Sequence, residues 1–240
     1  MNNKDSINYL VDSYSLENIK FSKPKKYKNE EYYISKVKYS KLSSNNELIT
    51  DNNLLLQFSK MNISSGYSES SNKVELEFIN NKYNKYSKYS NKVYNFLSKL
   101  DNHIIDTIHN NSEEWFEKKI PLENVKLMYN SFLKAPKSSE NNPSMVFSIN
   151  NNGTTFYDHK NNDLSFSDFK TSLQTESIVH LKYLMFSKDN CFTIWELISS
   201  KICKQKMNKV PKYGFIDDPL DFNTQEVESD NEDIIIKSFF

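Results

Sequence analysis

The hydrophobic pattern of this 240-residue chain changes its period twice, and no other feature limits its possible folds as strongly. Between two regions of alternating apolar and polar residues, apolar side chains recur at every third or fourth position over 87–110, as in an amphipathic helix. A second helix is expected over 121–134, with Pro121 at its first position. The alternating regions predict strands at 32–39, 54–58, 73–78, 145–149, 155–157, 178–186 and 192–202. The order β, α, β favours a barrel with a helical insertion at about 87–134 over alternating βαβ units.

Two of these segments carry further detail. Over 192–202 the apolar content would also suit a helix, but β-branched residues at a period of two favour a strand. In the strand expected at 32–39, one face carries Tyr33, Ser35, Val37 and Tyr39, and the other carries Tyr32, Ile34, Lys36 and Lys38.

Lysine is the only strong cation of the chain, because its 31 basic residues include no arginine. They balance 31 acidic residues, but unevenly: residues 215–240 hold eight acids and one lysine, a net charge of −7, which leaves +7 for residues 1–214. The charge distribution therefore predicts a basic flexible arm at 1–30, a folded binding domain at 31–210, and an acidic tail with an aromatic tip at 211–240.

Residues that enzymes use for phosphate binding and catalysis are few and scattered. The three glycines do not cluster, the four histidines lack metal-ligand spacing, and the two cysteines cannot form a metal quartet. We therefore expect no catalytic residue, no cofactor and no metal. A weak alternative is a metal-dependent nuclease that uses Asp158, His159 and Asp163. The chain also contains no long apolar run and no signal-peptide pattern, so we expect an intracellular protein without a membrane segment.

Lysine and tyrosine interleave in two stretches, over 25–39 and over 82–94. Lysines can follow a phosphate backbone while tyrosine rings stack on unpaired bases, and an OB-fold presents such residues on an exposed barrel face. The predicted fold class is therefore α+β, mainly β, a decorated OB-like barrel. Its predicted nucleic-acid-binding groove contains Lys25, Lys26, Tyr33, Lys36, Lys38, Tyr39, Lys82, Lys85, Tyr86, Lys88, Tyr89 and Lys92. The alternative is that these are low-complexity loops whose tyrosines pack locally.

The absence of arginine bears on what such a groove would recognise. Arginine supplies the commonest bidentate contact to guanine in the major groove, whereas lysine contacts phosphate as a point charge. Reading of duplex sequence is therefore the less favoured mode.

The tail ends in Phe239 and Phe240 behind an acidic stretch. A mobile polyanion can compete with nucleic acid for a basic groove, and a freed aromatic tip can bind replication proteins. The alternative is a solubilising tail whose apolar residues dock as a terminal strand.

Three segments, Leu54–Tyr67, Ser112–Phe116 and Phe192–Ile202, give the chain a family resemblance over roughly residues 50–205. In their order and spacing it resembles the single-stranded DNA-binding proteins of large nucleocytoplasmic DNA viruses, the African swine fever virus protein among them. The chain departs from that pattern at Glu117, where a glycine is expected. The resemblance implies an OB-type fold, binding of single strands during viral DNA replication, no cofactor, and a location in the cytoplasm or nucleus of an infected cell. It leaves open whether Trp115 and Trp195 are core or stacking residues.

These observations predict a non-enzymatic protein that binds single-stranded DNA without sequence preference, with RNA as the alternative ligand. Replication proteins are the expected partners of the tip, and self-association is left open. The competing hypothesis is a viral protein with an interaction or structural role, whose aromatics make protein contacts and whose lysines are solvated surface.

Overall fold

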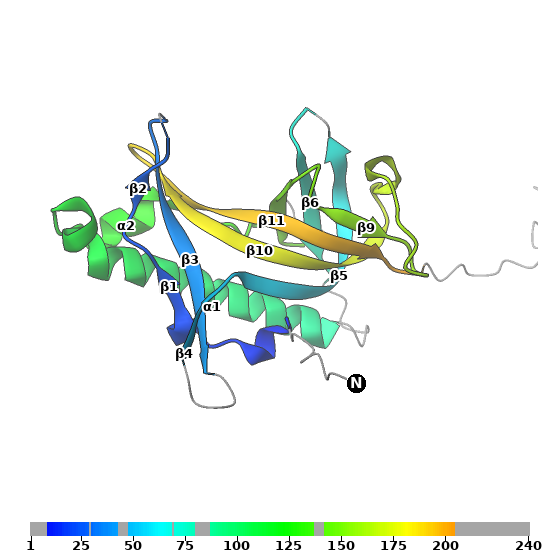
Figure 1. Ribbon diagram of the computed structural model, residues 1–240, viewed down its shortest axis with the longest axis horizontal. Coiled ribbons are helices and arrows are strands. Elements are labelled where there is room, and N and C mark those ends of the chain that lie inside the picture. Colours follow the sequence, from blue (N-terminus) through cyan, green and yellow to red (C-terminus); the bar gives the residue numbers. More distant parts are fainter. Residues whose placement is uncertain are drawn as a thin grey trace, which may run out of the picture. The chain divides into compact units, whose positions relative to one another are not determined.

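The computed structural model describes residues 9–28, 30–42, 48–68, 70–79, 87–136 and 142–204 (Figure 1). All of them lie in one compact unit, Met1–Gln205. A second unit, Lys206–Phe240, lies outside the described residues, and the predicted acidic tail and its aromatic tip lie within it.

Five strands form a closed barrel. They are β5 (Leu54–Ser68), β6 (Lys73–Phe78), β8 (Ser144–Ile149), β10 (Gln174–Phe186) and β11 (Cys191–Ile202). Each pairs with the next around the ring β5–β6–β8–β11–β10–β5, and all pairs are antiparallel except β8 with β11. In chain order this ring reads first, second, third, fifth, fourth, which is the Greek-key order of the OB-fold. The prediction of an OB-like barrel is confirmed.

The barrel interior is built by alternation along each strand. In β6 every second side chain is buried, beginning at Val74, and β8 alternates in the same way from Met145. Aromatic rings fill the space between these strands, with Phe58 packed against Phe78 and Phe147. Trp195 is 2% exposed and Trp115 is 8% exposed, so both tryptophans belong to the core.

The helical insertion leaves the barrel after β6 and returns at β8. Helix α1 (Ser87–Phe116) buries the predicted stripe Val93, Leu97, Leu100, Ile104 and Ile108 and packs along β5 (Figure 1). It continues past the predicted end at residue 110, because Trp115 and Phe116 pack on Phe186 at the end of β10. The predicted helical insertion is thus confirmed.

The second helix is shorter than its apolar pattern predicts. Helix α2 (Leu122–Met128) ends where Tyr129 begins β7 (Tyr129–Asn130), which pairs in parallel with β11. The Tyr129 hydroxyl donates to Asp101 on α1, and so does the hydroxyl of Ser131. Burial raises the pKa of Asp101, and these two hydrogen bonds oppose the shift. Strand pairing with β11 and the hydrogen bonds to the half-buried Asp101 carboxylate therefore outweigh the local helical pattern after residue 128.

β5 is also longer than predicted. Its apolar start at 54–58 is found, and the strand then continues to Ser68 through two register shifts. Gly66 lies within this strand, where a Cβ atom would come 3.0 Å from the Phe169 carbonyl oxygen. Close backbone approach explains this glycine better than a turn does.

The N-terminal strands extend the barrel wall. β3 (Tyr33–Leu42) pairs at its start with the end of β10, and β1 (Ile19–Phe21), β2 (Lys25–Lys26) and β4 (Leu48–Asn52) pair with β3. Val11 and Ile19 are buried in the same core as the barrel residues. The described part of the predicted flexible arm is therefore folded, because Val11 and Ile19 are buried while its lysines stay on the surface.

Tyrosine hydroxyls cover the edge of β5 that does not face β10. The phenols of Tyr14 and Tyr89 donate to the carbonyl oxygens of Leu55 and Gln57, and the Gln57 N–H donates to the carbonyl oxygen of Tyr9. Burial, with neighbouring tyrosines, raises the pKa of Tyr14 to about 12, so its hydroxyl remains a donor. The remaining elements are the 3-10 turns η1 (Val11–Ser13), η2 (Leu16–Asn18) and η3 (Phe166–Asp168) and the short strand β9 (Thr155–Tyr157).

Candidate nucleic-acid interface

One side of the sheet formed by β1, β2, β3 and the end of β10 gathers lysines and tyrosines. Residues directly opposite each other in an antiparallel pair share a face, and alternate residues along a strand do so too. The register pairs Lys20 with Lys38, Lys25 with Ile34, and Lys36 with Tyr183. We call this surface the lysine–tyrosine face and define it as Lys20, Lys25, Tyr27, Tyr32, Ile34, Lys36, Lys38, Tyr183 and Met185.

The four lysines of this face are exposed, and its three tyrosines are half-buried. Tyr27 and Tyr32 stack, with ring centroids 5.4 Å apart and an angle of 15° between the planes. The ammonium of Lys28 lies 5.2 Å from the centroid of the Tyr27 ring. Desolvation, followed by the negative charge of Glu30, raises the pKa of Tyr32, so its phenol is neutral at pH 7. The face thus offers positive charge beside flat, uncharged rings.

A bulge in β10 borders the lysine–tyrosine face. The register with β11 shifts between Leu181 and Tyr183, so Lys182 and Tyr183 are both partly exposed although they are neighbours in the strand. The Lys182 ammonium lies 5.5 Å from the centroid of the Tyr183 ring and 3.1 Å from the Glu196 carboxylate on β11. Burial acts to lower the pKa of Lys182, but the hydrogen bond and charge of Glu196 outweigh it and raise the pKa.

His180 is the second basic residue beside Glu196. Its Nδ1 atom lies 3.9 Å from the carboxylate. Burial lowers the pKa of His180; the negative charge of Glu196 opposes this shift, and the positive charge of Lys182 adds to it. At neutral pH His180 is therefore uncharged, and Lys182 is the charged partner of Glu196.

Some of the groove residues predicted within the stretch 25–39 lie close together in the structure; these are the first predicted set. Lys25, Lys36 and Lys38 lie on the lysine–tyrosine face, whereas Lys26 and Tyr33 lie opposite each other on the other side of the same strands. The prediction for Tyr39 is wrong. Its ring is 6% exposed and its hydroxyl bonds to the main chain of Ser13 and Ser15, so it cannot stack on a base.

The described members of the second predicted set, which spans 82–94, are not on this face. Lys82, Lys85 and Tyr86 lie outside the described residues. Lys88 is exposed on α1, Lys92 is paired with Asp12 at 2.6 Å, and the Tyr89 hydroxyl is bonded to β5 and to Val11.

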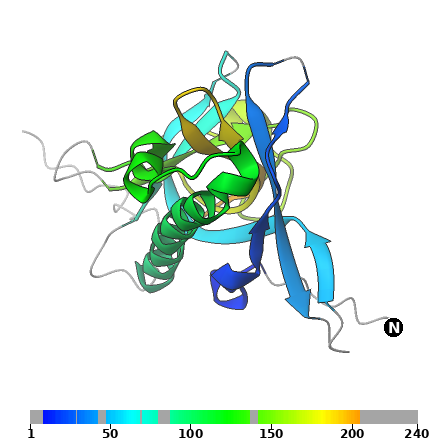
Figure 2. The same ribbon diagram turned by 90° about the vertical axis from the view of Figure 1, so that its left-hand side faces the viewer.

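Helix α1 packs against the opposite side of β1 (Figure 2). The ring of Phe21 lies 6.3 Å from that of His103 on this helix, and Phe21 points away from Lys20 on the same strand. The described members of the two sets therefore do not form the single groove that was predicted.

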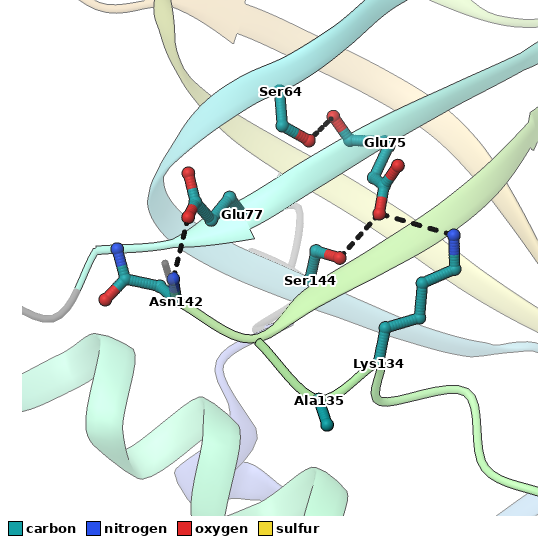
Figure 3. Close-up of a pocket in the computed structure, with 7 residues that line it drawn as sticks. All are labelled: Ser64, Glu75, Glu77, Lys134, Ala135, Asn142 and Ser144. Atoms are coloured by element: carbon teal, nitrogen blue, oxygen red, sulfur yellow. Dashed lines mark hydrogen bonds and ion pairs between the residues drawn. The ribbon is translucent and has the colours of Figure 1, made fainter. Parts of the chain in front are cut away.

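The face of β6 and β8 differs in charge. In OB-folds this is the face that carries oligonucleotides. Here its outward positions include Glu75 and Glu77, which lie opposite Val146 and Ser144. A pocket of about 230 Å³ opens beside them, lined by Ser64, Glu75, Glu77, Lys134, Ala135, Asn142 and Ser144 (Figure 3).

Both carboxylates of this face have partners within the chain. Glu75 accepts a hydrogen bond from Ser144 at 2.6 Å and pairs with Lys134 at 3.3 Å, and Glu77 accepts one from the Asn142 N–H at 2.8 Å. Two carboxylates repel phosphate, so this face is a poor nucleic-acid surface.

The residues predicted for the groove did not include Lys20, Tyr27, Tyr32, Lys182 and Tyr183, although Tyr27 and Tyr32 lie in the interleaved stretch 25–39. For Tyr32 the signal was present, because the alternation of 32–39 already placed it with Lys36 and Lys38. For Lys182 and Tyr183 no sequence signal exists, since their position depends on a bulge and on pairing with strands far away in the chain.

The alternative metal site has no support among the described residues. They contain no group of three or more His, Cys, Asp or Glu residues that could hold a metal ion. Asp158 instead accepts hydrogen bonds from the backbone N–H groups of Lys160 and Asn162, which close a local turn and lower its pKa. Within the described part of the chain, no helix has the length and hydropathy to cross a membrane.

Comparisons with known proteins give one family. A solved structure similar to this chain is the single-stranded DNA-binding protein from bacteriophage Enc34, with 13% sequence identity and a TM-score of 0.40, over 78% of this chain and 90% of that chain. The same phage protein in complex with single-stranded DNA has 12% identity and a TM-score of 0.39, over 78% and 96%. No curated protein matches the sequence. The model of a family of unknown function, DUF5871, matches residues 79–217, which is more than half of the chain. The chain therefore belongs to the family DUF5871.

Proposed function

We propose that this protein binds single-stranded nucleic acid without sequence preference, through the lysine–tyrosine face. The observation that carries the proposal is the joint exposure of four lysines beside stacked tyrosines on a face without an acidic member. Lysines follow the phosphates of a strand, and rings accept any base, because every base has a π-face. This combination suits an unpaired strand better than a duplex, whose bases are already stacked.

The proposed function also includes a specific ligand, a biological setting and two roles for the C-terminal tail. The bound strand is DNA, the setting is viral DNA replication as the family resemblance implies, and the protein acts by binding rather than by catalysis. The acidic tail competes for the face, and Phe239 and Phe240 bind a replication protein. What supports competition by the tail is the charge of +7 in residues 1–214 against −7 in residues 215–240.

A binding experiment with three probes tests the proposal. Fluorescence anisotropy would compare oligo-dT, an abasic strand of equal length and a duplex of equal length at several salt concentrations. We expect oligo-dT to bind most tightly, because only it offers both phosphates and free bases. Four lysine–phosphate contacts predict a log–log salt slope of about −3 for single strands.

The other outcomes are equally informative. Equal affinity for oligo-dT and the abasic strand would remove the role of the tyrosines. Absence of salt-dependent binding to every probe would refute the proposal and favour a role in protein contacts.

A further inference from the structure

The pair formed by Lys182 and Glu196 stands at the border of the lysine–tyrosine face. Lys182 is adjacent to Tyr183, a member of the face, and its ammonium lies 5.5 Å from the centre of that ring. The side chain of Lys182 is 34% exposed, whereas that of Glu196 is 10% exposed. The lysine is therefore open to a ligand, and the carboxylate that holds it is largely covered.

We propose that Lys182 is a further phosphate-binding residue of the lysine–tyrosine face, and that it exchanges Glu196 for a phosphate of the bound strand. This inference rests on the proposed function of that face. In the free protein Glu196 neutralises Lys182, so the carboxylate limits the affinity of the site. Since a phosphate and a carboxylate compete for the same ammonium, each binding event must break the contact of 3.1 Å.

His180 makes the exchange feasible. A largely buried carboxylate without a cationic partner costs free energy. Glu196 would be in this state whenever Lys182 moved to a phosphate. The His180 ring is already 3.9 Å from the carboxylate on the same side of β10. The residue opposite His180 on β5 is Leu55, so no further charged group faces the ring from that strand. When Lys182 moves to a phosphate, His180 becomes the cation that pairs with Glu196 once it is protonated.

The variant Glu196→Gln removes the competing charge and keeps the shape of the side chain. We expect it to bind oligo-dT roughly two- to fivefold more tightly, the range of one partly exposed ion pair. The salt slope should stay near that of the wild type, because Lys182 contacts a phosphate in both complexes. The double variant Glu196→Gln/Lys182→Gln should return to the wild-type affinity within about twofold, because the pair is replaced without a change in net charge.

The control is Glu123→Gln. Glu123 also forms a pair with a lysine, Lys126, at 2.8 Å, but it lies on α2, which contributes no residue to the face. This variant changes the net charge equally and should leave both affinity and slope unchanged. An equal gain in Glu123→Gln would attribute the effect to net charge and overturn the exchange. So would a Glu196→Gln protein that binds like wild type.

A second measurement uses the wild-type protein and does not depend on whether a variant folds. The pKa of His180 would be followed by NMR in the free protein and in the complex with oligo-dT. When Lys182 moves from Glu196 to a phosphate, its positive charge no longer lowers the pKa of His180, so this pKa should rise on binding. By linkage, a proton taken up on binding means that affinity rises as the pH falls through the titration of His180. An unchanged His180 pKa in a saturated complex would refute the exchange, whereas absence of any binding would refute the proposed function itself.

Discussion

The lysine–tyrosine face and the face of β6 and β8 are two surfaces of one OB-like barrel and its extension, yet their chemistry is opposite. The first joins Lys36 and Lys38 to half-buried tyrosines, while the second presents Glu75 and Glu77 around a polar pocket. The usual OB binding surface thus carries two carboxylates here. The cationic surface depends on β1, β2 and β3, strands added to the five-stranded ring. The comparison teaches that the barrel order identifies the fold, while the charge on each face locates the candidate site.

Loss of lysines from the first face should have the largest effect. Lys36→Gln/Lys38→Gln should weaken oligo-dT binding roughly 50-fold at about 50 mM salt and reduce the salt slope by about 1.4, because two phosphate contacts are lost. The matched control is Lys118→Gln/Lys170→Gln, two exposed lysines outside the face. Anisotropy titrations check both proteins. Equal losses in the two double variants would show that overall charge, rather than this face, binds the strand.

Loss of tyrosine rings should have an intermediate effect. Tyr27→Ala/Tyr32→Ala should weaken oligo-dT binding about tenfold, near the lower end of what one base stack contributes, since these rings already stack on each other in the free protein. Tyr33→Ala is the control, because this ring is the more exposed one, at 47%, but lies on the opposite side of β3. If Tyr33→Ala weakens binding more than the double variant, the bound strand follows the other side of the hairpin. Thermal melting would confirm that all three proteins fold.

Changes on the β6–β8 face should have the smallest effect. Glu75→Gln/Glu77→Gln removes two negative charges but preserves the side-chain shapes around the pocket. We expect less than a twofold gain in affinity, because this surface does not contact the strand and exposed charges more than about 10 Å away are screened at 0.1 M salt. A gain of tenfold or more would place the strand on this face after all.

Much of the fold was predictable because its hydrophobic periods are clear. The stripe from Val93 to Ile108 predicted α1, and the alternation of 73–78 predicted β6 with its exact bounds. What failed were the local patterns that tertiary pairing overrides. The expected helix over 121–134 yields to β7 after Met128, since Tyr129 can pair with β11 and bond to Asp101.

The candidate site was predictable only in part. Alternation separated Lys36 and Lys38 from Tyr39 correctly, but sequence alone could not tell that the side with Tyr39 faces the core. Composition marked residues 1–30 as an arm because lysines are conspicuous, whereas burial depends on a few apolar residues such as Val11 and Ile19. The position of Lys182 depends on a bulge in β10, and no local sequence pattern predicts that bulge.

The tyrosine hydroxyls on β5 have a consequence for association between copies. A strand edge with free carbonyl and N–H groups is a template onto which another chain can add a strand. The edge of β5 at Leu55 and Gln57 is instead occupied by two phenols and by the main chain at Tyr9, so three hydrogen-bonding groups are already satisfied. Phenols from η1, α1 and their flanks cannot propagate a ladder as a strand would. At Leu55 and Gln57 the edge of β5 therefore cannot pair with a strand of another molecule through these groups, which disfavours edge-to-edge association of copies.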